Sequence, residues 1–281
     1  MGFVEAFDHF VVPVDDLVAA EEFYVRVFDA PIVGRNGLNV AQRLRGAVPH
    51  TFIRVAGKRM GVYLQSETRP EPTGVRGSPT FSFETTGDGL HETRADLDDV
   101  GAPYEGPIDL DRPFALSSLY FNDPAGNHYH VYVPEGDRAS SPDAPDERMI
   151  NVGYLELEAP DLEASIRFYE QVLGFKLEER GENARQEARQ ATLRLPSGQL
   201  LILTEVPFSP KGLIMSRTVP GPHLGFRIAA ANWHSALTRL EELRIPHGDR
   251  GAAKVRRPGD GGTYIDDPAG YVVQYITDGM E

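Results

Sequence analysis

The sequence predicts an α+β protein built from four βαβββ modules in two domains. The first observation is internal repetition: DLVAAEEFYVRV at 16–27 matches DLEASIRFYEQV at 161–172, an offset of 161 − 16 = 145 residues. Further matches follow, with YFNDPAG at 120–126 recurring as YIDDPAG at 264–270, and LHETRADLDDVGAP at 90–103 paralleling WHSALTRLEELRIP at 233–246. The second observation is that apolar residues within each half switch between the two-residue period of strands and helical spacing.

The elements of the first half follow from these periods. AFDHFVVPV (6–14) alternates like a strand, DDLVAAEEFYVRVF (15–28) has helical spacing with Asp near its start, and HTFIRVAGKRMGVYLQ (50–65) predicts two strands around a short turn. The same order returns in the second module, with a strand at 79–86, a helix at 88–100 and strands at 116–121 and 128–133. Because the chain is duplicated, the second half is expected to repeat both modules.

The boundary between the halves lies in EGDRASSPDAPDERM (135–149), which is rich in Asp, Ser and Pro and lacks apolar periodicity. We therefore expect a first domain at 1–135, a linker at 136–149 and a second domain at 150–281.

Composition narrows the class of protein. The 281 residues carry 28 Lys and Arg against 42 Asp and Glu, and the net charge of −14 argues against nucleic acid or an anionic membrane as a partner. The chain has no cysteine, which excludes disulfides, thiolate metal sites and a catalytic thiol. Its N-terminus lacks the basic start and apolar stretch of a signal peptide, so we expect a cytoplasmic protein.

Strand alternation places candidate side chains on one surface of each domain, opposite the face that packs on the helices. In the first domain this surface is predicted to carry four of the eight histidines: His9, His50, His128 and His130. In the second domain the same alternation places one histidine, His223, on this surface. It also places Tyr154, Gln274 and four charged residues there: Glu156, Glu158, Arg194 and Arg227. A single metal site would accordingly be expected in the first domain.

Several of these motifs resemble the vicinal oxygen chelate superfamily, which includes glyoxalases, extradiol dioxygenases, and fosfomycin and bleomycin resistance proteins. The resemblance rests on His9-x-x-Val-x-x-x-Asp16-Leu17, on FYEQVLGF at 168–175 and on the DPAG segments at 123–126 and 267–270. It implies that modules pair into two half-open barrels, the glyoxalase/bleomycin resistance/dihydroxybiphenyl dioxygenase fold, with a divalent metal on the concave face. Because four modules already supply both halves of each barrel, a monomer or a homodimer is expected.

The resemblance also implies where metal ligands would lie, namely on the first and last strands of modules. The first-strand positions are His9, Thr80, Tyr154 and His223, and the last-strand positions are Tyr63 or Gln65, His130, Ile202 and Gln274. No carboxylate stands at any of them. The expected ligands are His9, His130 and Gln65, with Tyr63 or His128 as alternatives to Gln65, holding Fe²⁺, Mn²⁺, Ni²⁺ or Zn²⁺. No organic cofactor is indicated.

Other side chains on the predicted surface are candidates for chemistry on a substrate. His128 and Tyr120 are candidate catalytic residues for proton transfer, although Tyr120 recurs as Tyr264 and could be a packing aromatic of the repeat. The candidate substrate-binding residues are His50, Arg54, Tyr63 and Thr80. In the second domain, Tyr154, His223 and Gln274 could form another site. Alternatively that domain could be degenerate, with Glu156 or Glu158 pairing with Arg227 or Arg194.

Together these features predict a glyoxalase- or dioxygenase-like metal-dependent enzyme, a lyase, an isomerase or an extradiol-type dioxygenase. It would act on a small molecule with adjacent oxygens, using the metal as a Lewis acid. Two alternatives stay open. One is a metal-free small-molecule binding protein like the bleomycin resistance members, and the other is an interaction scaffold.

Overall fold

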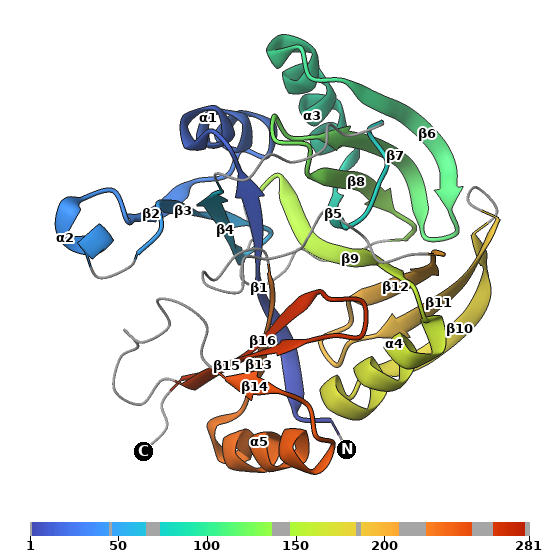
Figure 1. The fold of residues 1–281 in the computed structure, drawn as a ribbon. Helices are drawn as coiled ribbons and strands as arrows, with labels where there is room; N and C mark the ends of the chain where they lie inside the picture. Colours follow the sequence, from blue (N-terminus) through green and yellow to red (C-terminus); the bar gives the residue numbers. More distant parts are fainter. Residues whose placement is uncertain are drawn as a thin grey trace. The chain divides into compact units, whose positions relative to one another are not determined.

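The computed structural model describes residues 2–44, 47–65, 74–136, 147–183, 187–207, 223–248 and 261–278. Its strands form two eight-stranded mixed sheets accompanied by few helices, as expected for an α+β protein (Figure 1). Among the described residues, the helices are all too short or too polar to serve as membrane spans. Most of the predicted linker lies outside the described residues.

The chain separates into two compact units, each assembled from more than one segment. Unit 1 comprises Met1–Val11, Leu44–Ala47 and Glu156–Glu281, and unit 2 comprises Val12–Arg43 and Val48–Leu155. Two long strands, β1 (Val4–Val14) and β9 (Met149–Ala159), contribute residues to both units. The physical reason is strand pairing: β1 opens the first module but pairs antiparallel with β13, the strand that opens the fourth (Figure 1).

In its described residues, unit 2 contains three helices, the end of β1, the start of β9 and seven further strands. Its strand orders are β1-β4-β3-β2 and β9-β5-β8-β7-β6. The elements are α1 (Leu17–Val27), β2 (Ile32–Asn36), α2 (Val40–Leu44), β3 (His50–Val55), β4 (Lys58–Leu64), β5 (Thr80–Thr85), α3 (Gly87–Val100), β6 (Tyr104–Arg112), β7 (Ala115–Asn122) and β8 (His128–Pro134).

Unit 1 contains the strand orders β14-β15-β16-β13-β1 and β10-β11-β12-β9. Its elements are α4 (Leu162–Phe168), a π-helical turn (Tyr169–Leu173), β10 (Lys176–Asn183), β11 (Ala188–Arg194), β12 (Leu200–Glu205), β13 (His223–Ile228), a 3-10 turn (Ala230–Asn232), α5 (Trp233–Glu242), β14 (His247–Gly248), β15 (Gly261–Asp266) and β16 (Val272–Thr277).

The repeated Asp-Leu motif begins two helices. The Asp16 side chain accepts hydrogen bonds from the backbone N–H groups of Val18 and Ala19 at the start of α1, and Asp161 accepts one from Ala164 at the start of α4. These carboxylates satisfy N–H groups that have no partner within the helix. The motif quoted for family resemblance is therefore, in part, a helix cap.

The repeated tyrosine and DPAG segments form a second structural device. In unit 1 the Tyr169 hydroxyl donates to Asp267, 2.9 Å away, and the other Asp267 oxygen accepts from the backbone N–H groups of Ala269 and Tyr271. In unit 2, Tyr24 and Asp123 make the equivalent hydrogen bond. Each bond ties the helical segment after a first strand to the turn before a last strand.

Candidate functional site

Two equivalent rows of side chains cross the sheets, one in each unit. In unit 1, backbone pairing aligns Tyr264 with Gln274, Gln274 with Gly225, and Gly225 with His9. Paired residues project from the same face, and His223 shares that face because it lies two residues before Gly225. In unit 2 the equivalent alignment joins Tyr120, His130 and Ser82, and Ser82 hydrogen-bonds the backbone of Tyr154.

The unit 1 row brings together two histidines that are far apart in sequence. The Nε2 atoms of His9 and His223 are 3.1 Å apart, and the two rings meet edge to face. Both residues are buried, at 5% and 6% exposure. The Tyr264 ring packs edge-on against His223, with ring centroids 5.3 Å apart. Two imidazole nitrogens thus converge on one buried point.

The second ring nitrogen of His9 is also held. Asp8 Oδ1 lies 2.7 Å from His9 Nδ1, and the Arg227 guanidinium binds the other Asp8 oxygen. Burial alone would raise the pKa of Asp8, but the hydrogen bond and charge of His9 and the charge of Arg227 outweigh it and hold that pKa below its usual range. An ionised carboxylate only accepts hydrogen bonds, so His9 Nδ1–H is the donor in its contact with Asp8. In the neutral form of His9 this leaves Nε2 as an acceptor facing His223.

Gly225 makes room for the His9 ring. A Cβ atom at this position would lie 2.2 Å from His9 Cε1 and 2.3 Å from Nδ1. Any side chain would therefore have to displace the imidazole, or be displaced by it.

This donor set suits a divalent transition metal in its chemistry. Imidazole nitrogens of histidine are common ligands for such ions, and the other ring nitrogen of a ligand histidine is often hydrogen-bonded to a carboxylate, as His9 is to Asp8. In the part of the chain that the structure describes, no cluster of three or more His, Cys, Asp or Glu side chains could hold a metal. The amide oxygen of Gln274, a buried residue in this row, is a candidate for a further protein ligand.

The unit 2 row has different chemistry around His130, which is 0% exposed. Its ring stacks on Tyr120 at 4.1 Å and on Tyr132 at 5.1 Å, and its Nδ1 lies 2.7 Å from the Tyr154 hydroxyl. Its Nε2 has no hydrogen-bond partner among the described residues. Burial, followed by the charges of Arg112 and Arg76, lowers the pKa of His130 well below its ordinary value, so the ring is neutral.

The candidate catalytic residues both lie in unit 2. The Tyr120 hydroxyl donates to Asp111 at 2.5 Å, and burial, the largest cause, raises the pKa of Tyr120 to about 12. At neutral pH it is a proton donor rather than a base. His128 Nδ1 lies 2.7 Å from the Asn122 side-chain oxygen.

The candidate substrate-binding residues are also in unit 2, but each has local partners. His50 stacks on Tyr63 with ring centroids 4.2 Å apart, and burial lowers the pKa of His50. Arg54 forms an ion pair with Glu147 at 2.7 Å, and the Thr80 hydroxyl donates to the Gly77 carbonyl. His9 belongs to unit 1, whereas its predicted co-ligands Gln65 and His130 belong to unit 2.

The expected ion pairs of Glu156 and Glu158 are wrong. Arg227 binds Asp8 and Asp278, and Arg194 binds Glu178 on the neighbouring strand β10. Burial and then the nearby Glu156 raise the pKa of Glu158. Arg227 and Arg194 therefore form ion pairs with carboxylates other than Glu156 and Glu158.

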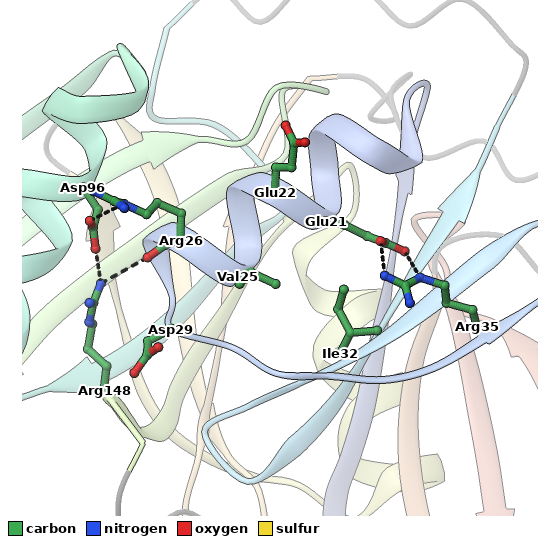
Figure 2. A pocket seen from close by; sticks show the side chains of 9 residues that line it. All are labelled: Glu21, Glu22, Val25, Arg26, Asp29, Ile32, Arg35, Asp96 and Arg148. Atoms are coloured by element: carbon green, nitrogen blue, oxygen red, sulfur yellow. Dashed lines mark hydrogen bonds and ion pairs between the residues drawn. The ribbon is translucent and has the colours of Figure 1, made fainter.

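A surface pocket of about 600 Å³ lies elsewhere in unit 2, along α1 (Figure 2). Figure 2 shows Arg35 paired with Glu21 at one end, and Arg26 and Arg148 both directed at Asp96 at the other. None of the candidate residues predicted from sequence lines this pocket.

Sequence reasoning missed Asp8 and Gly225 as parts of the site. The available signal was Asp8 standing directly before His9. Regular alternation, however, would place adjacent side chains on opposite faces.

Comparisons with known proteins follow the duplicated architecture. A family model described as the Glyoxalase/Bleomycin resistance protein/Dioxygenase superfamily matches residues 6–131 and 151–275. A Bacillus subtilis structure described as a "putative dioxygenase" is similar with a TM-score of 0.71 at 14% identity, covering 99% of this chain and 86% of that one. Glyoxalase I from Zea mays is similar with a TM-score of 0.66 at 17% identity, covering 96% and 92%. No curated protein matches the sequence. At these identities the structural likeness establishes the fold.

Proposed function

Because the chain belongs to the glyoxalase/bleomycin resistance protein/dioxygenase superfamily, we propose that it is a metal-dependent enzyme acting on a small molecule with adjacent oxygens. The observation that carries the proposal is the approach of His9 Nε2 to His223 Nε2, 3.1 Å apart and buried. In this contact one ring nitrogen can donate to the other, and the same approach would let both imidazoles bind one cation.

In this proposal His9 and His223 hold the ion, and Gln274 is the third candidate ligand. When bound, a divalent metal supplies Lewis-acid chemistry to substrate oxygens. The chain's own residues prepare the site: Asp8 holds the proton on His9 Nδ1, and Tyr264 packs against the His223 ring. Burial of both histidines keeps water away from the ligand atoms and so strengthens their interaction with a cation.

The set expected from sequence, His9, Gln65 and His130, stays a prediction. So do the roles of His128 and Tyr120 in proton transfer and of His50, Arg54, Tyr63 and Thr80 in substrate binding. The contacts within unit 1 favour His223 as the partner of His9, because its Nε2 lies 3.1 Å from His9 Nε2.

Metal content of single variants tests the proposal. We expect about one equivalent of Fe²⁺, Mn²⁺, Ni²⁺ or Zn²⁺ per chain in protein purified without a histidine tag and measured by elemental analysis. His9→Ala and His223→Ala should each lose it, because two imidazoles are needed to hold the ion. His130→Ala should keep it, and the exposed His91→Ala is the matched control.

Other outcomes discriminate clearly. Loss of metal in His130→Ala with retention in His223→Ala would replace our ligand set by the one expected from sequence. Absence of metal from wild-type protein, even after anaerobic reconstitution with each of the four ions, would overturn the proposal. If the wild-type protein does bind metal, assays of the metal-loaded protein with hemithioacetals and catechols would identify the reaction.

A metal-free small-molecule binding protein is the second candidate. It is favoured by one observation, namely that the described residues contain no group of three or more His, Cys, Asp or Glu side chains placed to hold a metal. Ligand binding that persists in His9→Ala and His223→Ala protein would support this candidate.

A further inference from the structure

We propose that Asp8, held by Arg227, is a positioning residue that fixes the tautomer and ring orientation of His9 for metal binding. The inference rests on the proposed function, because it takes His9 to be a ligand. Asp8 itself touches neither the ion nor a substrate in this proposal and acts through His9.

The contact between Asp8 and His9 depends on a local break in strand pairing. Phe7 pairs with Phe226 and His9 pairs with Gly225, so β1 advances two residues while β13 advances one. Asp8 is the extra residue of a β-bulge, a feature that redirects side chains. In a regular strand two adjacent side chains would point to opposite faces, whereas here they meet at 2.7 Å.

The carboxylate is held from its other side as well. Arg227 binds the second Asp8 oxygen and also binds Asp278. Asp8 has little freedom to rotate away from His9, since its side chain is only 9% exposed and both of its oxygens are engaged. The arrangement matches the carboxylate–histidine–metal pattern, in which the outer carboxylate sets which nitrogen is free to bind.

The duplicated half of the chain provides an internal comparison. Residues 145 positions after Asp8 and His9 are Gly153 and Tyr154, and the residue 143 positions before Arg227 is Glu84. Glu84 instead accepts hydrogen bonds from Tyr132 and Asn151. The Asp–Arg pair therefore accompanies His9 and is absent from the equivalent positions beside Tyr154.

The test is the Zn²⁺ dissociation constant of full-length Asp8→Asn protein, measured by competition with a chromophoric chelator. Asparagine keeps the size of the side chain but can offer an N–H to His9, so we expect Zn²⁺ binding to weaken about 10- to 100-fold. Asp278→Asn, which changes a carboxylate on the same arginine but leaves Asp8 in place, should change binding less than threefold. Arg227→Gln should give an intermediate loss and serves as the second variant if Asp8→Asn fails to fold.

A second readout does not involve metal. Long-range ¹H–¹⁵N spectra of histidine-labelled, metal-free protein report which ring nitrogen of His9 is protonated. We expect the Nδ1–H form in wild type and a loss of that preference in Asp8→Asn. An unchanged dissociation constant together with an unchanged tautomer would overturn the inference and leave the proposed function standing. Failure of wild-type protein to bind Zn²⁺ would overturn the proposed function and the inference with it.

Discussion

Gly225 shows how a residue without a side chain shapes the candidate site. We expect Gly225→Ala to weaken Zn²⁺ binding at least tenfold, because the new Cβ would lie 2.2 Å from the His9 ring and must shift it. Overpacking of this kind costs about 1–3 kcal/mol of stability. Chelator competition and thermal unfolding would measure both effects.

The control for this substitution is Gly181→Ala in β10, where a Cβ would meet no atom within 4 Å. Unaltered Zn²⁺ binding in Gly225→Ala would show that the position of the His9 ring does not determine metal affinity.

At the residue scale, sequence indicated His9 as a ligand and His223 as a candidate for a separate site, but not their proximity. The four first strands alternate alike, so their pattern does not say which strand pairs with which. Asp8 escaped notice for a related reason: a bulge has no clear signature in a short apolar run.

At the scale of elements, Asp267 makes the turn before β16 sensitive to pH. Burial, the largest cause, raises the pKa of Asp267 to about 6, against the hydrogen bond from Tyr169. The folded protein therefore binds a proton here that the unfolded chain releases near pH 4. The free energy of unfolding should fall, on the order of 2 kcal/mol, as pH rises from about 4 through 6.

Urea unfolding of wild type and Asp267→Asn between pH 4 and 7 tests this expectation. The variant should lack the fall, whereas the exposed neighbour Asp266→Asn should retain it. A wild-type stability that rises over this range would contradict the assignment to Asp267.

Sequence patterns located the inner strands better than the outer ones. The strands at 6–14, 50–55, 79–86 and 128–133 were all predicted, because one face of each is continuously buried. β2, β6 and β10 are edge strands of the two sheets, and the sequence pattern did not predict residue ranges for them. Edge strands bury few side chains, so their apolar alternation is weak. The π-helical turn at Tyr169–Leu173 was also missed, since FYEQVL fits ordinary helical spacing.

For the whole molecule, metal binding should stabilise one unit selectively. A ligand that binds only the folded state adds to the free energy of unfolding. We expect excess Zn²⁺ to slow amide exchange in β13 and the first part of β1 and to leave β7 and β8 unchanged. Hydrogen-exchange mass spectrometry would measure this, and protection centred on β8 would point instead to His130 as a ligand.

The family and the duplicated α+β fold were predicted correctly from sequence because repeats and motifs are local properties. The composition of the two compact units was beyond reach, since it depends on contacts between segments separated by most of the chain.

The pairing of β1 with β13 also bears on how the protein is made. His9 and His223 are separated by 214 positions, so during translation β1 cannot pair with β13 until the intervening residues have been synthesised. Unit 2 ends at Leu155 and has its strands available much earlier. Because chains generally fold from the N-terminus as they emerge, and distant pairings form slowly, we expect unit 2 to fold on the ribosome and unit 1 to close last. The candidate metal site would then be completed only after β13 and β16, which carry His223 and Gln274, have been synthesised.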